Sequence, residues 1–344
     1  FLNVDLTGIK AQTHASLTAM RGLIRYADIT GKPEYVNEVE KRWEIYRKQG
    51  MTEFYGNYNW FCRYDTWTEP CAIVDAFMVA SQLWQHTGKA EYRDDAERIY
   101  YNAICLAQRS NGGFGLENSP GKARNSHSVT MNCDEAHWCC TMRGGEGLGR
   151  AADYTAFKKD NELAIPFFRS VKVAEKLNAG DVNIEMSTEY PFGNGVSVNV
   201  KAAPDKKITL SLEKTSWMKN YVVKVNGKSV KYDDADGLAK VTRRFKAGDK
   251  LTVSFEMAPR YEGMVNSENS NPGDFRVMYG PLVLACGVGD DTNVAYGEEF
   301  GGSVRESFKG NKSGVVLSPL YHLMSPKVNM AAQPPFSRRI VFTK

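Results

Sequence analysis

The sequence lacks any apolar run of the roughly 18 residues that a membrane-spanning helix needs, and no signal peptide is visible at its start. It also lacks a long basic block, because the formal net charge of +4 is spread over 344 residues. We therefore expect neither a membrane nor a nucleic acid as a partner. What is present, 42% hydrophobic and 24% charged residues, is typical of a globular protein large enough for two domains.

A disulfide framework is also missing. The seven cysteines are an odd number and cluster in the first half of the chain, and two of them, Cys139 and Cys140, are neighbours. Adjacent cysteines seldom bond to each other because the resulting ring is strained. Metal binding or catalysis is the more economical interpretation, and buried structural thiols are the alternative.

Residues 1–157 have the pattern of a helical domain. Apolar residues recur at steps of three and four, and two segments, 25–35 and 82–92, share an amphipathic helix followed by Thr-Gly-Lys-x-Glu-Tyr. The glycine of this motif favours a left-handed helix end, with a second helix starting shortly after it. Repeated helix hairpins predict an α/α toroid or solenoid. Residues 1–157 are too short for a complete toroid of six hairpins, so either the ring is incomplete or the helical domain is a smaller stack. Because the chain starts at Phe1, we favour an incomplete ring whose N-terminal helices are missing.

Residues 158–344 have a β pattern. Four alternating runs occur at Val196–Val200, Ile208–Leu212, Tyr221–Val225 and Leu251–Phe255, with Asn-Gly and Gly-Asp turns between them. Short strands at this spacing predict a β-sandwich. The separation of helical and β parts favours a multidomain chain over an α/β fold.

Two cysteine-containing motifs could carry chemistry. Pro70 suits the first turn of a helix, so Glu69 and Cys71 are expected at a helix N-terminus, where the helix dipole favours anions. The second motif is Cys139-Cys140, followed by a glycine-rich segment that we expect to form a turn. Three thiolates and one carboxylate suit tetrahedral zinc. Spacing alone also allows a chance arrangement.

Several other short motifs follow in a fixed order. They are Glu-Arg-Ile-Tyr-Tyr-Asn at 97–102, Tyr-Pro-Phe at 190–192, Val-Asn-Gly at 225–227, Gly-Asp at 248–249 and Gly-Pro-Leu-Val at 280–283. With Glu69-Pro-Cys71 and the cysteine pair, they resemble the β-L-arabinofuranosidase-type family of glycoside hydrolases, family 127. The resemblance covers nearly the whole chain and implies an (α/α)6 barrel followed by β-sandwich domains.

The resemblance also implies a mechanism. Zn²⁺ would be bound by Glu69, Cys71, Cys139 and Cys140, and Cys139 would be the nucleophile of a retaining, exo-acting glycosidase. A zinc-bound thiolate would replace one of the two carboxylates of ordinary retaining enzymes. The expected substrate is an oligo- or polysaccharide containing β-L-arabinofuranose or a related sugar. A homodimer is left open.

The general acid/base is less well defined. The family places a glutamate about sixteen residues before the zinc-binding glutamate, which reaches Glu53, but the sequence around Glu53 does not match the family segment. Asp65 is the alternative, and an exposed surface carboxylate is the simplest interpretation of either residue.

Further residues are expected near the sugar. His14 and Glu97 match family residues, and His137 and Trp138 flank the cysteine pair. Helix packing or a surface ion pair would explain them equally well. The chain departs from the usual Cys-Cys-Pro-Pro-Asn of the family after Cys140. Arg143 or Glu146 is therefore expected to contact a different sugar, an acidic one in the case of Arg143.

Two other classes of protein remain open. The first is a non-catalytic carbohydrate-binding protein with a structural zinc site, which would keep its glycan affinity without Cys139. The second is a redox thiol protein, which would hold no stoichiometric zinc when reduced.

Overall fold

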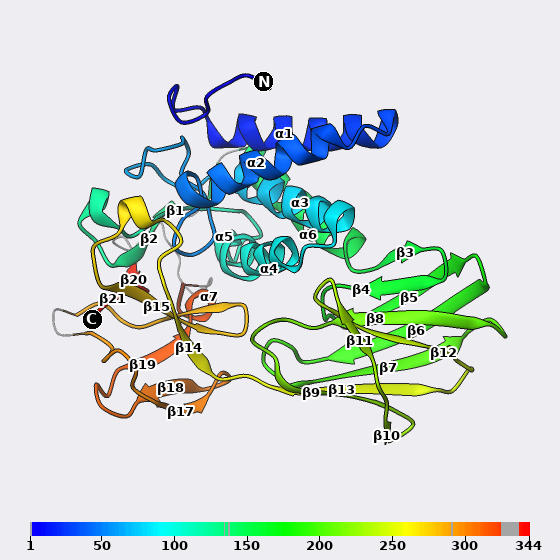
Figure 1. Cartoon of the computed structure of the whole chain (residues 1–344). Coiled ribbons are helices and arrows are strands. Elements are labelled where there is room, and N and C mark those ends of the chain that lie inside the picture. Colours follow the sequence, from blue (N-terminus) through cyan, green and yellow to red (C-terminus); the bar gives the residue numbers. More distant parts are fainter. Residues whose placement is uncertain (1, 134, 137, 290–291, 325–336) are drawn as a thin grey trace. The chain divides into compact units, whose positions relative to one another are not determined.

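A computed structural model of the chain describes residues 2–133, 135–136, 138–289, 292–324 and 337–344. Helices come first and many strands follow (Figure 1), as the sequence predicts. The chain divides into two compact units that we describe separately. Unit 1 contains Phe1–Thr87, Asp94–Gly149 and Pro259–Lys344, and unit 2 contains Gly88–Arg93 and Arg150–Ala258.

The helices of the repeated motif end where the sequence pattern indicates. Gly31 follows α1 and Gly88 follows α3, with φ of 67° and 69°, so both glycines of the repeated motif adopt the left-handed conformation. None of the described helices combines the length and the apolar character required to cross a bilayer. The helices are α1 (Thr13–Thr30), α2 (Glu34–Gln49), α3 (Pro70–Thr87), α4 (Ala90–Ile99), α5 (Cys105–Ala107), α6 (Cys139–Asp153) and α7 (Leu320–Met324), with a π-helical turn at Tyr100–Ile104.

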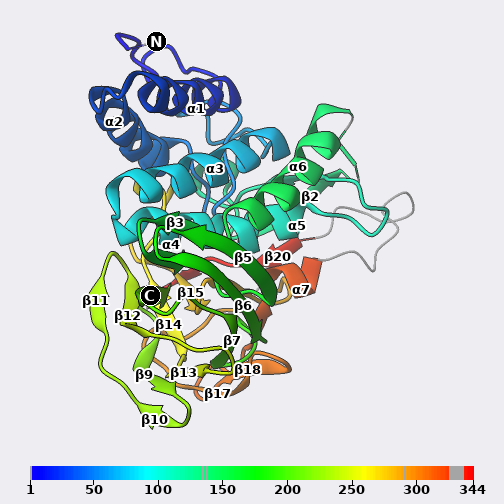
Figure 2. The same ribbon diagram turned by 90° about the vertical axis from the view of Figure 1, so that its right-hand side faces the viewer.

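Helix α3 is the central element of unit 1. Its residues from Pro70 to Ser81 are all buried, and it packs against α1 and α2 (Figure 2). An apolar surface on every side is what a helix needs when it is surrounded by other elements. Helix α1, by contrast, buries one stripe that includes Leu17, Met20 and Ile24 and leaves its other face exposed. One charged residue, Asp75, lies inside the buried part of α3.

The C-terminal strands belong to unit 1 together with the helices, a grouping that differs from the boundary near residue 157 expected from the sequence. Strand β20 pairs with β2 through Ser128 and Arg339, which joins the C-terminal segment to the segment before α6. The strands are β1 (Leu116–Asn118), β2 (Ser128–Cys133), β14 (Pro259–Glu262), β15 (Asp274–Tyr279), β16 (Leu282–Ala285), β17 (Phe300–Ser303), β18 (Ser307–Gly310), β19 (Val316–Pro319), β20 (Ser337–Arg339) and β21 (Phe342–Thr343).

Unit 2 contains two sheets, with strand orders β10-β9-β13-β7-β6-β5 and β11-β12-β8-β4-β3. The four predicted runs all form strands, in β7, β8, β9 and β13, and Asn226-Gly227 joins β9 to β10 as a hairpin turn. The strands are β3 (Phe157–Lys159), β4 (Glu162–Ile165), β5 (Val171–Leu177), β6 (Gly180–Thr188), β7 (Gly195–Ala202), β8 (Lys207–Glu213), β9 (Lys219–Val225), β10 (Lys228–Ser229), β11 (Asp233–Ala235), β12 (Leu238–Arg244) and β13 (Lys250–Glu256).

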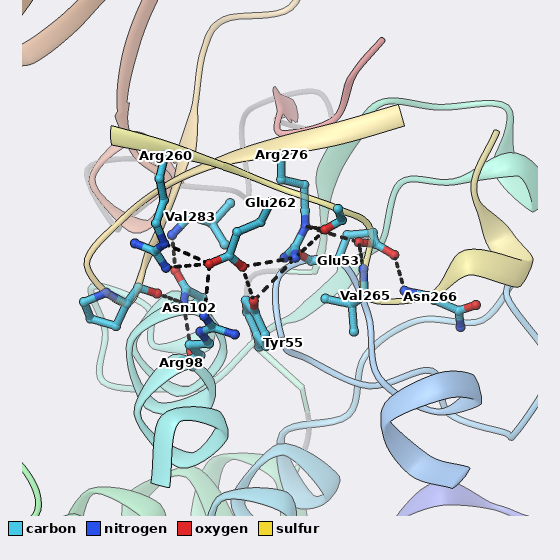
Figure 3. A network of polar contacts seen from close by, with 12 residues as sticks. Glu53, Tyr55, Arg98, Asn102, Arg260, Glu262, Val265, Asn266, Arg276 and Val283 are labelled. Carbon is cyan, nitrogen blue, oxygen red and sulfur yellow. Dashed lines mark hydrogen bonds and ion pairs between the residues drawn. The ribbon is translucent and has the colours of Figure 1, made fainter. Parts of the chain in front are cut away.

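A buried polar network connects the C-terminal strands of unit 1 to its helical part (Figure 3). Glu262 of β14 lies 3.0 Å from the Arg98 guanidinium, 2.6 Å from that of Arg260 and 3.7 Å from that of Arg276. Burial raises the pKa of Glu262, but the three arginines outweigh that effect and lower the pKa to about 2. The ionised carboxylate therefore stabilises the folded chain.

A second connection in this network joins two of the motifs that carry the family resemblance. The Asn102 side chain donates to the Pro281 carbonyl at 2.8 Å and accepts from the Val283 amide at 2.7 Å. Since Asn102 is buried, this pair of hydrogen bonds fixes the turn into β16 against the helical part.

We predict that Glu262 stabilises unit 1 most above pH 4.5. Because its pKa falls from 4.5 in the unfolded chain to about 2 in the folded one, its contribution of about 3 kcal/mol should vanish as the pH drops between these values. Chemical denaturation of the parent chain and Glu262→Gln should give a stability difference that shrinks across this range. Glu256→Gln, at the exposed end of β13, is the control; a difference independent of pH would contradict the prediction.

Candidate metal centre

Two helix N-termini supply the cysteines. Helix α3 begins at Pro70, so Glu69 precedes its first turn and Cys71 lies within it, as predicted. Helix α6 begins at Cys139 and continues through residues 141–147. The expectation of a turn after the cysteine pair is therefore wrong, because this segment is helical. The glycines there serve close packing instead: a Cβ on Gly144 would lie 2.2 Å from the Phe114 ring, and one on Gly147 would lie 2.6 Å from Val74 of α3.

The ligand atoms of the predicted set gather in two overlapping groups. The sulfurs of Cys71, Cys139 and Cys140 all lie within 4.8 Å of one another, and atoms of His14, Glu69 and Cys71 do likewise. Cys71 belongs to both groups, and its Sγ lies 3.8 Å from that of Cys140. The fold thus brings together residues that are 68 or more positions apart in the sequence, and it adds His14 to them.

The chemistry of these donors fits a thiophilic cation. Glu69 Oε2 is buried without a hydrogen-bond partner in the part of the chain that the structure describes, and burial raises the pKa of this carboxyl. A buried carboxylate oxygen that lacks a donor is costly unless a cation binds it. Three thiols beside it are the ligands that zinc and other soft metals prefer.

The Cys71 thiol donates a hydrogen bond to the sulfur of Cys140. Their hydrogen bond raises the pKa of Cys71 and lowers that of Cys140 to about 7, although burial acts against ionisation of both. One of the two sulfurs is therefore ready to act as an anionic ligand near neutral pH.

Asp75 was not foreseen from the sequence, although it is the one carboxylate within the apolar run of α3. It accepts hydrogen bonds from Thr18 Oγ1 at 2.6 Å and from Arg21 Nη1 at 2.6 Å, and His14 Nε2 lies 3.3 Å away. The guanidinium of Arg143 also donates to it. A buried charge of this kind requires such partners, so Asp75 joins α1, α3 and α6 next to the ligand cluster.

His14 lies between two carboxylates. Its Nδ1 is 3.6 Å from Glu69 Oε1, and its Nε2 faces Asp75. The hydrogen bond to Asp75 raises the pKa of His14, burial lowers it, and the charge of Glu69 raises it further. The histidine thus connects Glu69, a candidate ligand, to the buried Asp75.

The predicted acid/base residues lie outside this cluster. Glu53 is 1% exposed, and its carboxylate accepts the backbone N–H groups of Val265 at 2.7 Å and Asn266 at 2.8 Å (Figure 3). Burial raises its pKa, and Arg276 partly opposes the rise. Asp65 is exposed and hydrogen-bonded to Arg63, which lowers its pKa.

The predicted sugar-binding residues have different environments. Trp138 is 82% exposed and directly precedes α6, whereas Glu97 in α4 is buried. His137 lies outside the described residues. Arg143 contacts Asp75 and Glu146 within the chain, so the expectation that it meets an acidic sugar has no structural support.

Two protein-family models match the chain. The catalytic domain of family GH127 β-L-arabinofuranosidases matches residues 4–153, and the middle domain of the same family matches residues 162–257. Together they cover more than two thirds of the sequence. No protein with a curated description matches it.

Solved structures share the fold at low sequence identity. A GH127 β-arabinofuranosidase superimposes with a TM-score of 0.80 at 19% identity, over 97% of this chain and 60% of its own. A GH127 β-L-arabinofuranosidase from Geobacillus stearothermophilus T6 gives 0.76 at 16%, with coverages of 97% and 60%. A third structure, described as a glycoside hydrolase, gives 0.76 at 14%, with 96% and 66%. This chain thus spans about three fifths of the length of the first two.

We predict that the reduced chain binds one thiophilic divalent ion and that Cys71→Ser abolishes stoichiometric binding, because the sulfur shared by both groups is lost. Elemental analysis after gel filtration measures this. Cys62→Ser is the matched control, since that thiol donates to Gln49 at 3.0 Å outside the cluster. A reduced parent chain without metal would support the redox interpretation instead.

Proposed function

The chain belongs to the GH127 β-L-arabinofuranosidase family, and on that premise we propose that it is a glycoside hydrolase whose reaction takes place at the cluster of Glu69, Cys71, Cys139 and Cys140. One observation carries the proposal: the three thiols form one group of possible ligands, Glu69 and His14 form a second group that shares Cys71, and Glu69 has a buried oxygen without a donor in the described chain. A cluster of this composition is costly to fold unless it serves binding or catalysis.

In this proposal the two parts of the chain have distinct roles. Residues 1–157 belong to an (α/α)6 catalytic barrel, and the following strands form β-sandwich domains. The repeated helix hairpins and the two multi-stranded sheets support this assignment. The expected partner is an oligo- or polysaccharide.

Zn²⁺ is the proposed cofactor, bound by Glu69, Cys71, Cys139 and Cys140; it would keep the thiolates ionised and oriented. The residues of the chain prepare the site for it. Cys71 and Cys140 are buried, so their sulfurs are suited to holding the ion, whereas Cys139 is exposed and accessible to a ligand from solvent.

Cys139 is therefore the proposed nucleophile. Its thiolate attacks the anomeric carbon and forms a C–S bond while the glycosidic C–O bond breaks, and the departing oxygen takes a proton from a general acid. Water then attacks the same carbon after losing a proton to that group, and the thiolate leaves. Two inversions give net retention. The proposed substrate is a β-L-arabinofuranoside or a related sugar, cleaved from a chain end.

Glu53 remains the proposed acid/base, and Asp65 the alternative. Burial raises the pKa of Glu53, which is the direction that a general acid needs. The lowered pKa of exposed Asp65 disfavours it. His14, Glu97, His137 and Trp138 are the proposed sugar-binding residues. The exposed Trp138 ring next to Cys139 supports its role best, because an aromatic face suits the C–H surface of a sugar.

One observation favours a second function, a non-catalytic carbohydrate-binding protein with a structural zinc site. Both oxygens of Glu53 already accept backbone N–H groups, so its carboxylate also has a structural role. The two functions differ in their need for Cys139, since only catalysis uses its nucleophilicity.

We predict that Cys139→Ser lowers kcat on aryl β-L-arabinofuranosides by more than about a thousandfold, because a hydroxyl is a far weaker nucleophile at neutral pH. Compared without metal, the unfolding midpoint should stay close to that of the parent chain, and the affinity for arabinose-containing glycans should be retained. Steady-state kinetics measure kcat, and calorimetric titration measures the affinity for the glycans. A parent chain that binds glycans and turns over none of them would indicate the binding protein.

We predict that Glu53→Gln slows hydrolysis of glycosides with poor leaving groups much more than that of activated aryl glycosides, because only the former need a protonated leaving oxygen. The ratio of kcat/KM for the two substrate classes reports this. Asp65→Asn is the matched comparison. An equal loss on both classes, together with a lowered unfolding midpoint, would limit Glu53 to its structural contacts.

A further inference from the structure

A pair of charged residues lies one helical turn behind the ligands of the cluster. Asp75 is four residues after Cys71 on α3, and Arg143 is four residues after Cys139 on α6. Residues spaced by three or four lie on the same side of a helix. The Arg143 guanidinium donates to the Asp75 carboxylate, so the same helix faces that carry the ligands also carry this ion pair.

The carboxylate of this ion pair is buried. Asp75 is 0% exposed, so an isolated carboxylate there would destabilise the fold. Its donors on α1, which are Thr18 and Arg21, hold it from one side, and Arg143 is its partner on α6. The ion pair is therefore a directional contact between α3 and α6.

The first turn of helix α6 is held by Thr141, whose Oγ1 accepts the Phe114 N–H at 3.2 Å and donates to the Ala136 carbonyl at 3.1 Å, but neither contact reaches α3. Four of the residues of α6, at 144, 145, 147 and 149, are glycines. Gly144 and Gly147 allow a close approach to Phe114 and Val74, but they offer no side chains to interlock with α3. Phe114 and Val74 fit only against these glycine positions and so restrict sliding of α6, and the charged contact one turn from the ligands adds a direct bond between α6 and α3 that restricts the register further.

We propose that Asp75 and Arg143 are positioning residues whose ion pair sets α6 against α3 and so brings the Cys139–Cys140 pair to Cys71. The inference rests on the metal site of the proposed function. In this inference Arg143 helps to assemble the metal centre and does not contact a sugar. His14 extends the arrangement, because it joins Asp75 to Glu69 on the other side of the cluster.

The test measures metal affinity in the reduced chain of residues 1–344. Co²⁺ is the probe, its thiolate charge-transfer absorption reports the sulfur ligands, and competition with a chelator gives Kd. Arg143→Gln should weaken binding by roughly 10- to 100-fold, the range for lost outer partners of metal ligands, and reduce the charge-transfer band. Arg143→Lys should recover part of the affinity because it keeps the charge.

Arg21→Gln is the matched control. Arg21 donates to the same carboxylate at 2.6 Å, but from α1, so it does not connect α3 to α6. Its loss should change Kd by less than about threefold, well below the effect of an outer partner of the ligands. An equal loss for Arg21→Gln and Arg143→Gln would overturn the proposal, since it would reflect the burial of Asp75 alone.

A double variant distinguishes lost positioning from misfolding caused by an unpaired buried charge. Asp75→Asn with Arg143→Gln removes both buried charges, which destabilises less than leaving one unpaired. Its Kd should match that of Arg143→Gln, not the product of two independent losses. If Kd is unchanged in both Arg143→Gln and the double variant, the positioning role is overturned, whereas the proposed metal site is not. A parent chain that binds no Co²⁺ would overturn the proposed metal site itself, and the inference with it.

Discussion

A carboxylate buried among three helices must find donors on them, and Asp75 does so with Thr18 and Arg21 of α1 and Arg143 of α6. Its position one turn from Cys71 means that satisfying this charge also fixes where the thiols meet. The energetic penalty of burying an unpaired carboxylate is larger than the gain from any single apolar contact along α6. The geometry of the ligand cluster thus follows from charge satisfaction in the layer behind it.

The segment that leads to Glu69 depends on a second buried network. Glu53 holds the backbone at Val265 and Asn266, and Arg276 donates to the Glu53 carbonyl at 2.8 Å. The C-terminal strands therefore support the loop between α2 and α3 from which Glu69 projects. Because these contacts join residues on both sides of unit 2 in the sequence, unit 1 can form fully only when the C-terminal part of the chain is present.

The same network explains two motifs that carry no obvious chemistry. Asn102 and the 280–283 segment are far apart in the sequence, yet they pair through two hydrogen bonds in a buried position. A resemblance between sequences can therefore rest on structural partners as much as on catalytic groups. In this chain the catalytic proposal rests on Glu69 and the three cysteines, and Asn102 and the 280–283 segment join the helical part of unit 1 to its C-terminal strands.

The sequence by itself determined the local features: the start of α3 at Pro70, the left-handed glycines at 31 and 88, the four β runs, and the types of ligand that could gather. These depend on capping, backbone conformation and periodicity within a few residues. Tertiary structure decided the Asp75–Arg143 pair, the partners of Glu53 and the placement of 259–344. Asp75 and Arg143 are 68 residues apart, and Glu53 and Val265 are 212 apart. Buried charges at such separations find their partners only when the packed helices and strands exclude water around them.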